Sequence, residues 1–298
     1  MKISGAESLS VASNIFVGIE SAFTIRPFLN TMTASELCTV LTAGMATVAS
    51  NVLAIYIFTL KEYFPTIAGH LISASILSAP AAIVMSKILL PENETPQTLG
   101  ENIELSHEKE NSLFEAIING AYAGLKLIFG IVALLLAILG LVALFDLFLG
   151  WTGGRINFLL GLNIDWTLKG LLGYLFYPVV FILGAPSSEA FTVSKIIGER
   201  AILTEVTAYQ DLAMAISNGF IKDPRTIVVT TYALCGFAHV ASLAIFVGGI
   251  SALAPNKTQV LAAIGFRSLV AATLACLLTA AVAGTFYIRS SILSAPSF

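Results

Sequence analysis

Long apolar runs without a charged residue alternate with short polar segments along the whole chain. Five runs contain no Asp, Glu, Lys or Arg, namely residues 37–60, 127–145, 170–188, 226–256 and 268–288, and a sixth, 63–86, is interrupted only by His70. A helix needs ~20 residues to cross the ~30 Å hydrocarbon core of a bilayer. Each run is about that long, so the pattern predicts an all-α, polytopic membrane protein.

One segment is clearly polar. Residues 91–111 hold six acidic residues and two prolines, which is typical of an exposed loop between membrane segments. Residues 111–127 then place apolar side chains at helical spacing, with Glu115 and Lys126 among them. We therefore expect an interfacial amphipathic helix there, leading into a long membrane helix over residues 127–149.

A short pattern occurs twice. Residues 44–50 and 236–242 both read G-x-A-x-V-A-S in the middle of an uncharged run, and a glutamate precedes each copy, Glu20 for the first and Glu189 for the second. Chance is the alternative explanation, because these residue types are common in any membrane helix. The shared order of glutamate and small-residue segment favours two copies of one structural unit, the weak internal symmetry that transporters show.

These features predict four parts of the chain. We expect a first repeat over residues 1–90 and a polar loop over 91–111. An interfacial helix with a long membrane helix follows over 112–155, and a second repeat covers 156–298.

Composition narrows the function classes. Hydrophobic residues make up 57% of the chain and charged residues 11%, with a mean hydropathy of +0.89, whereas soluble domains carry roughly a quarter charged residues. A soluble enzyme is excluded. The net charge of -3 and the absence of a basic cluster argue against nucleic acid as a partner. Cys38, Cys235 and Cys276 lie in apolar runs and are expected to be core residues rather than zinc ligands or disulfide partners.

Glu189 follows the segment Leu-Gly-Ala-Pro-Ser-Ser, which breaks a helix. The chain can turn back there as a re-entrant hairpin, with Glu189 in the first turn of the returning helix, where the helix dipole favours a carboxylate. An interfacial residue at an ordinary helix end is the alternative. For Glu20 the alternative is stronger, because Arg26 follows closely and the two could pair.

His239 has three possible roles: a proton relay, a substrate contact, or a buried neutral imidazole bonded to the backbone. Its position in the repeated segment favours substrate contact. In the other copy Thr47, Ser50 and Asn51 offer hard oxygen ligands for a small cation, although a hydroxyl bonded to its own helix is the competing interpretation. His239 and Ser242 would suit a hydrolase only with an acid to orient the histidine, and none is nearby in sequence. We expect no enzyme.

These residues lie within motifs that resemble the concentrative nucleoside transporter family. The resemblance covers nearly the whole chain and is carried by these segments: Asn14-Ile15-Phe16-Val17-Gly18, Ile25-Arg26-Pro27-Phe28-Leu29, Ser35-Glu36-Leu37, Ser75-Ile76-Leu77-Ser78-Ala79-Pro80-Ala81, Leu90-Pro91-Glu92, Ser188-Glu189-Ala190 and Ala233-Leu234-Cys235-Gly236-Phe237-Ala238. It implies sodium- or proton-coupled symport of nucleosides, usually by a homotrimer. It also implies two re-entrant hairpins and two broken transmembrane helices arranged in an inverted repeat.

Residue by residue, the resemblance implies a sodium site and a substrate site. Asn14 and Val17 of the first hairpin look like sodium ligands, joined by Thr47 and the carbonyl of Val48. The substrate site would consist of Glu189 at the ribose hydroxyls, Phe237 and Ser242 around the sugar, Val52 at the base, and Glu20 and His239.

Two departures from the family pattern concern the substrate. Gly18-Ile19-Glu20-Ser21 stands where the family usually reads Gly-Gln-Thr/Ser-Glu, so one polar base-reading residue is missing and Ile19 replaces the other. His239 stands where the family has asparagine. Both departures point to an altered substrate.

The expectation is a sodium-coupled symporter of nucleosides or nucleoside-like solutes in the cell membrane, in contact with lipid and without an organic cofactor. Two alternatives stay open. One is a proton-coupled transporter of an altered substrate. The other is a non-transporting fragment or subunit that needs an N-terminal partner, because Met1 falls inside what resembles the first hairpin.

Overall fold

The computed structural model describes residues 2–48, 50–101 and 112–288. The described chain is helical, apart from an isolated bridge between Ser4 and Leu99. The α-helices are α1 Gly5–Val17, α2 Ser21–Thr24, α3 Ala34–Ala46, α4 Ser50–Leu60, α5 Ile67–Leu89, α6 Leu113–Leu160, α7 Leu168–Ile182, α8 Ser187–Ile202, α9 Glu205–Ser217, α10 Pro224–Leu234, α11 Val240–Leu253 and α12 Thr258–Thr285. Short 3-10 turns cover Gly18–Glu20, Arg26–Phe28 and Pro255–Lys257.

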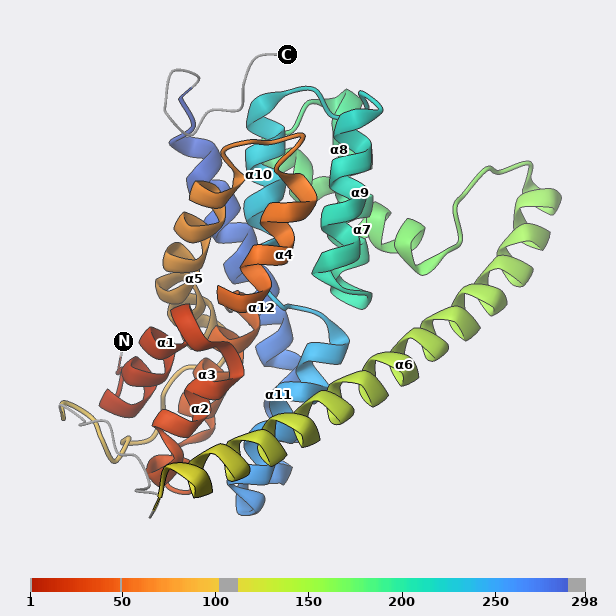
Figure 1. Cartoon of the computed structure of the whole chain (residues 1–298). Coiled ribbons are helices and arrows are strands. Elements are labelled where there is room, and N and C mark those ends of the chain that lie inside the picture. The colour runs from red at the N-terminus through yellow and green to blue at the C-terminus, as the bar shows by residue number, and fades with distance from the viewer. Residues whose placement is uncertain (1, 49, 102–111, 289–298) are drawn as a thin grey trace.

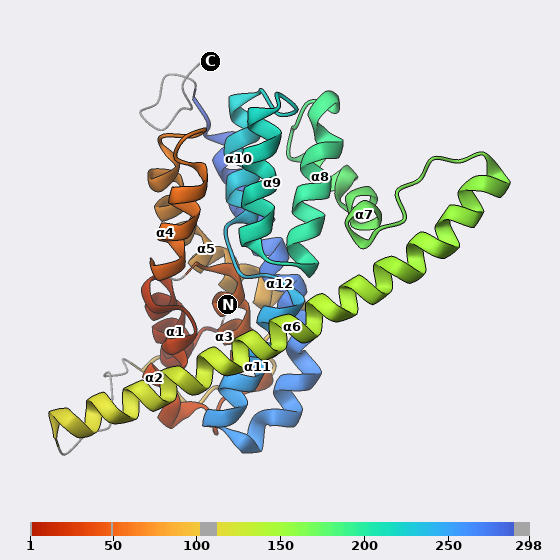
Figure 2. The same ribbon diagram turned by 45° about the vertical axis from the view of Figure 1, so that its right-hand side comes forward.

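Two halves of the chain pack into one body, and α6 runs diagonally across its outside (Figures 1 and 2). In the centre α12 packs against α3, α5 and α10, while α5 in turn packs against α3 and α10. Helix α3, which precedes the first break, and helix α10, which precedes the second, therefore each pack against both α5 and α12. This exchange of contacts is what two related repeats would produce, and it supports the interpretation of the repeated pattern.

Among the described residues, three helices are long and apolar enough to cross a membrane, over Ile67–Leu89, Ile128–Leu160 and Pro255–Thr285. Two shorter apolar helices, Leu168–Ile182 and Val240–Leu253, fall below that length. The runs at residues 37–60, 170–188 and 226–256, which we expected from length to be able to cross, are each divided between two helices. The divisions lie at the repeated pattern and at the predicted hairpin tip.

Both copies of the repeated pattern contain a helix break. The first lies between Ala46 of α3 and Ser50 of α4, and the second between Leu234 of α10 and Val240 of α11. Thr47 and His239 occupy the same place in the pattern, and both have an extended backbone, with φ/ψ of -102/164° and -137/166°. Thr47 follows the end of α3, whereas His239 precedes the start of α11, so the equivalent residues are both extended but bound their breaks on opposite sides.

The glycine of the second copy is required where the two breaks cross. Gly236 has φ +141°, and a β-carbon there would lie 2.7 Å from both the Ala46 carbonyl oxygen and the Cys276 thiol. A side chain would be strained in this conformation and would also clash. The first copy's glycine is covered differently, because a β-carbon on Gly44 would overlap the ring of Phe246 on α11.

The predicted break before Glu189 is confirmed. Helix α7 ends at Ile182, Gly184 adopts φ +87°, and α8 starts at Ser187 with Glu189 in its first turn. The two helices pack against each other along their length. Salt bridges support the base of this hairpin, where Lys169 of α7 contacts Glu199 of α8 at 2.6 Å and also Asp211 of α9.

The segment 111–160 differs from expectation. Instead of an interfacial helix followed by a membrane helix, α6 is one helix of 48 residues, begun by the Ser112 side chain accepting the amide of Glu115. No Pro interrupts it, so the amphipathic start and the apolar continuation share one axis. The helix also extends past the expected boundary at residue 155, to Leu160.

Candidate functional site

A buried polar cluster lies at the second break. Glu205, in the first turn of α9, is 2% exposed, and its Oε1 accepts a hydrogen bond from the Tyr56 hydroxyl of α4 at 2.6 Å. Its Oε2 lies 3.0 Å from Nε2 of His239. The cluster therefore joins α4 of the first half to the α8–α9 corner and to the break of the second half.

His239 is both a helix cap and a contact of Glu205. The main-chain N–H of Ser242 donates to Nδ1 of His239 at 3.2 Å, which satisfies an amide at the start of α11. We therefore assign the proton of the neutral ring to Nε2, which faces Glu205. The Ser242 hydroxyl lies 2.7 Å from the same Nε2.

This geometry differs from that of a hydrolytic triad. In a triad the serine and the acid bind opposite ring nitrogens, so that the acid orients the base. Here Ser242 Oγ lies closer to Nε2, at 2.7 Å, than to Nδ1, at 3.3 Å, and Glu205 Oε2 approaches Nε2 as well, while Nδ1 accepts a main-chain amide. The acid that was missing from the sequence neighbourhood is present in space, but it approaches the ring nitrogen to which the serine lies closer.

Aromatic rings enclose the cluster. The ring of Tyr209 on α9 lies 4.7 Å from that of Tyr56, and its hydroxyl donates to the carbonyl of Thr231 on α10 at 2.9 Å. Phe237 is half-buried, with its ring 6.3 Å from that of His239. Val52 on α4 is also half-buried and packs against a hydrophobic core that both halves share. Phe237, His239 and Ser242 thus gather at one break, as expected.

Glu189 lies elsewhere. Its Oε1 accepts the main-chain amides of Lys222 and Asp223 at 2.9 and 3.1 Å, the two residues just before α10, of which Asp223 is the N-cap. Helix α10 has 11 residues, so its start is about 16 Å from the break that follows its other end. The structure therefore brings Glu205, and not Glu189, to His239 and Ser242.

The contacts of Glu189 belong to a docked hairpin tip. Arg225 of α10 donates to the carbonyls of Leu183 and Gly184 at 3.2 and 3.0 Å, and to the carbonyl of Gly284 on α12 at 2.9 Å. The tip is thus held on the start of α10 by a carboxylate and a guanidinium together. Glu189 Oε2 is buried without a hydrogen-bond partner among the described residues.

The expected sodium ligands are oxygen and amide groups on α1 and at the first break, and α1 packs against both α3 and α4. Asn14 of α1 is fully buried, and neither atom of its side-chain amide has a hydrogen-bond partner in the described chain. Thr47 and Val48 are each 1% exposed, whereas Val17 is 45% exposed. The Thr47 hydroxyl donates to the Ala43 carbonyl at 2.8 Å, so its oxygen keeps lone pairs for a further ligand.

This first-break set fits sodium by its chemistry. A small hard cation prefers amide, hydroxyl and carbonyl oxygens, and an unsatisfied buried amide is costly unless a partner supplies its contacts. Glu20, by contrast, is exposed in the turn Gly18–Glu20 at the tip of the first hairpin.

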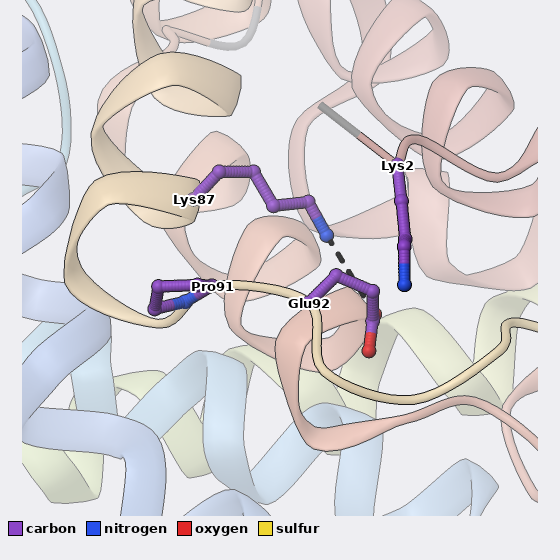
Figure 3. A pocket seen from close by; sticks show the side chains of 4 residues that line it. All are labelled: Lys2, Lys87, Pro91 and Glu92. Carbon is purple, nitrogen blue, oxygen red and sulfur yellow. Dashed lines mark ion pairs between the residues drawn. The ribbon is translucent and has the colours of Figure 1, made fainter.

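A second charged cluster lies at the far end of α5. Lys87 contacts Glu7 of α1 at 2.6 Å, Glu92 at 3.9 Å and the hydroxyl of Ser35 at 3.0 Å. With Lys2 and Pro91, Lys87 and Glu92 line a cavity of about 400 Å³ (Figure 3). Because these contacts join α1, α3 and α5, we interpret the cluster as a clamp on the first half.

Sequence reasoning missed Glu205 and this clamp. The clamp had a local signal, since Ser4 with Glu7 and Thr33 with Glu36 form capping boxes at the starts of α1 and α3. Glu205 had only a weak one. Thr204 caps α9 through the amide of Thr207, so a helix start could be found there. Nothing local indicates that His239 and Tyr56 meet its carboxylate.

Comparison with known proteins covers most of the chain. Residues 70–284 match a family model described as Na+ dependent nucleoside transporter C-terminus. Solute carrier family 28 member 3 of Eptatretus stoutii is 37% identical over 97% of this chain and 43% of its own length. The nucleoside permease NupC of Helicobacter pylori is 37% identical over 95% of this chain and 65% of its own.

Solved structures agree with these matches. The chain aligns with CNTnw in an inward-facing substrate-bound state with a TM-score of 0.77 at 34% identity, over 95% of this chain and 65% of that one. For the N149L form of CNTnw in the intermediate 3 state the TM-score is 0.81 at 35% identity, over 95% and 66%. The chain spans less than half the length of its vertebrate relatives and about two thirds of the bacterial proteins.

Proposed function

Because the chain belongs to the concentrative nucleoside transporter family and matches its C-terminal part, we propose that it carries out sodium-coupled symport of a nucleoside or a nucleoside-like solute. It is a helical membrane protein of a transporter family and not an enzyme. The observation that carries the proposal is the buried Glu205–His239–Ser242 cluster at the second break, separate from the first break, whose candidate ligands are neutral.

In the proposed substrate site, Glu205 would accept hydrogen bonds from the sugar hydroxyls. Each carboxylate oxygen can accept more than one hydrogen bond, so Oε1 and Oε2 keep capacity beside Tyr56 and His239. A hydroxyl donor bonded to a buried carboxylate forms a strong, charge-assisted hydrogen bond. The geometry supports Glu205 over Glu189 for this role, because only Glu205 shares a site with His239 and Ser242.

The apolar part of the substrate would meet aromatic and aliphatic side chains. Phe237 and Val52 are half-buried near the break, and a planar base packs well against such surfaces. In the sequence, Ile19 stands where the family resemblance implies a polar residue that reads the base. We therefore propose that the base is selected more by shape than by hydrogen bonds, which admits nucleoside-like solutes.

The proposed sodium site lies at the first break. Asn14, Thr47 and the carbonyls of Val17 and Val48 would hold the ion, since the buried Asn14 amide needs a partner. Sodium bound there would hold α1 of the first hairpin against the break of α3 and α4. Substrate and sodium would then favour the same arrangement of the two halves, which is what coupling requires.

Assembly and location follow the same proposal. We propose a homotrimer in the cell membrane. The relatives are longer than this chain, so substrate binding and transport are separate questions: a chain that needs an N-terminal partner would bind its solute without moving it.

Uptake into proteoliposomes tests the function. We expect the protein to take up radiolabelled uridine or adenosine when an inward sodium gradient is applied, and not with a potassium gradient. Glu205→Gln should weaken binding about 10- to 100-fold, because one charged acceptor is lost, while the exposed Glu62→Gln should match wild type. Uptake that ignores the gradient for every nucleoside tried would contradict the proposal.

His239 favours one alternative, a proton-coupled transporter. Its ring bridges Glu205 and the start of α11, and histidine changes charge between pH 5 and 8. Uptake driven by a proton gradient in sodium-free buffer would support this alternative over sodium coupling.

A further inference from the structure

One face of α1 buries three polar side chains at successive turns. Glu7, Ser10 and Asn14 are each 0% exposed, and their spacing of three and four residues places them on the same side of the helix. The hydroxyl of Ser10 and both atoms of the Asn14 amide have no hydrogen-bond partner among the described residues. A buried polar group without a partner costs free energy, so this face calls for partners such as water or an ion.

Other serines of α1 find a partner within the helix. The hydroxyls of Ser8 and Ser13 each donate to the main-chain carbonyl four residues earlier, at 2.9 and 2.8 Å. Ser10 makes no such bond with any described residue. Its oxygen therefore remains available on the face that also carries Asn14.

Helices α3 and α5 pack against α1 and against each other. Two contacts fix how α5 lies along α1, because Lys87 contacts Glu7 at 2.6 Å and the Ser75 hydroxyl donates to the Ile15 carbonyl at 3.3 Å. Ser10 lies between these two points along α1. The buried residues of α5 between its two contacts are all small, namely Ser78, Ala79, Ala81, Ala82 and Ser86. The buried part of α5 that runs past Ser10 therefore offers little apolar bulk.

The outer end of the polar face reaches a cavity. Lys2, Lys87, Pro91 and Glu92 line this space of about 400 Å³ (Figure 3). Lys2 and Pro91 are exposed, whereas Lys87 is 7% exposed, so the cavity leads inward from the surface. Since Lys87 also contacts Glu7, the cavity and the polar face meet at this ion pair.

Acidic groups outnumber the lysines at this cavity. Three carboxylates lie here, because Glu7 and Glu36 both accept hydrogen bonds from Ser4 and Glu92 lines the cavity itself. Two lysines line it as well, so three negative charges against two positive ones leave a formal charge of -1. A negative entrance raises the local concentration of cations.

We infer that the Glu7–Ser10–Asn14 face of α1 is a water-lined route for cations between this cavity and the proposed sodium site. The inference rests on the proposed function, because Asn14 is a ligand of that site. A sodium ion on this route meets a carboxylate, a hydroxyl and an amide oxygen in turn, each about 5–6 Å from the next. Such hard oxygen ligands replace part of its water shell. The route connects the site with the side of the membrane at which α5 ends.

Thiol labelling of position 10 tests the route. Ser10→Cys in the purified full chain should react with aminoethyl methanethiosulfonate, with the rate measured by intact mass spectrometry. Val11→Cys is the matched control, because Val11 is 3% exposed on the same helix but packs in an apolar core cluster. We expect Ser10→Cys to react at least tenfold faster. Wild type, whose three cysteines are buried, is the blank. Equal rates would overturn the route, since a hairpin that merely opens exposes both positions.

The charge of the reagent tests the preference for cations. Sulfonatoethyl methanethiosulfonate carries the opposite charge to the aminoethyl reagent. The ratio of the cationic to the anionic rate should be at least fivefold higher at Ser10→Cys than at Ser8→Cys, because Ser8 is exposed and reports the intrinsic reactivity of the two reagents. The same ratio at both positions would contradict a route for cations.

Sodium affinity after labelling connects the route to the site. An ammonium group attached at position 10 lies one turn from Asn14 and repels a second cation. Labelled Ser10→Cys should therefore bind sodium at least tenfold more weakly than the unlabelled variant, measured by the sodium-induced shift of the melting temperature. Unchanged affinity would overturn the route.

The labelling rates also separate this inference from the proposed function, because labelling needs neither sodium nor a nucleoside. An unreactive Ser10→Cys in a protein that binds sodium would overturn the route alone. A wild type whose melting temperature ignores sodium would refute the proposed sodium site, and with it the ion that the route carries.

Discussion

The two helix breaks share a sequence pattern and differ in charge. At the first, between α3 and α4, the described candidate ligands are neutral, and the buried amide of Asn14 has no hydrogen-bond partner. At the second, between α10 and α11, His239 and Tyr56 contact the buried carboxylate of Glu205. The same sequence pattern therefore carries neutral oxygen and amide groups in one copy and a buried carboxylate with a histidine in the other.

The crossing point of the breaks should be the most sensitive position. Gly236→Ala would place a β-carbon 2.7 Å from the Ala46 carbonyl oxygen in a backbone conformation with φ +141°. We expect a loss of about 3 kcal/mol in the free energy of unfolding, from overpacking and backbone strain together. The melting temperature of the purified variant in detergent measures this loss.

Two other glycines calibrate that effect. Gly44→Ala meets the Phe246 ring rather than backbone, so its cost should be smaller than that of Gly236→Ala. Gly248→Ala, in α11 with nothing within 4 Å, should be neutral or stabilising by up to about 1 kcal/mol. Equal stability of the Gly44 and Gly236 variants would show that the two copies do not differ in this way.

If the first break binds sodium and the second binds the substrate, substitutions at the two breaks should have opposite effects on the two affinities. Asn14→Leu should weaken sodium binding at least tenfold, because it removes an oxygen ligand at nearly constant size, and leave substrate affinity at saturating sodium within about threefold. Glu205→Gln should weaken substrate binding at least tenfold and leave sodium affinity within about threefold. Sodium- and substrate-induced shifts of the melting temperature measure the two affinities separately.

Ser13→Ala is the matched control for Asn14. Its hydroxyl donates to the Leu9 carbonyl within α1, so the variant should bind sodium as wild type does. If Asn14→Leu lowered substrate affinity as much as sodium affinity, the two halves would not be separable as proposed.

The smallest effect is expected at His239. Asparagine is a good helix cap and can also donate to Glu205, so His239→Asn should change substrate affinity less than fivefold at pH 8. Substrate-induced shifts of the melting temperature of wild type and variant measure this difference. A loss of more than tenfold in His239→Asn would show that the imidazole makes a contact that asparagine cannot replace.

Much of the fold was predictable because its signals are local. The length of each apolar run, the acidic loop before α6 and the Gly-Ala-Pro segment before α8 predicted the membrane class, the division of the chain and the hairpin. The repeat predicted two breaks, and both lie in the predicted segments. The continuity of α6 was not predicted, because a change from amphipathic to apolar character does not require a change of helix axis.

The candidate site was only partly predictable. Phe237, His239 and Ser242 share one sequence segment, and the structure keeps them together. Glu189 was singled out because it follows a helix break, but its amide partners lie at the start of α10. Glu205 attracted no attention, because an acidic residue in the first turn of a helix is ordinary.

The sequence by itself determined that this protein lies in a membrane and where its helices must break. Both follow from properties that add along the chain, the transfer of apolar side chains into lipid and the conformations that glycine, proline and short polar residues allow. Only the tertiary structure decided which polar groups meet. Tyr56 and Glu205 form a hydrogen bond across 149 positions of sequence, because the crossing of helices, and not their order along the chain, brings buried polar groups together.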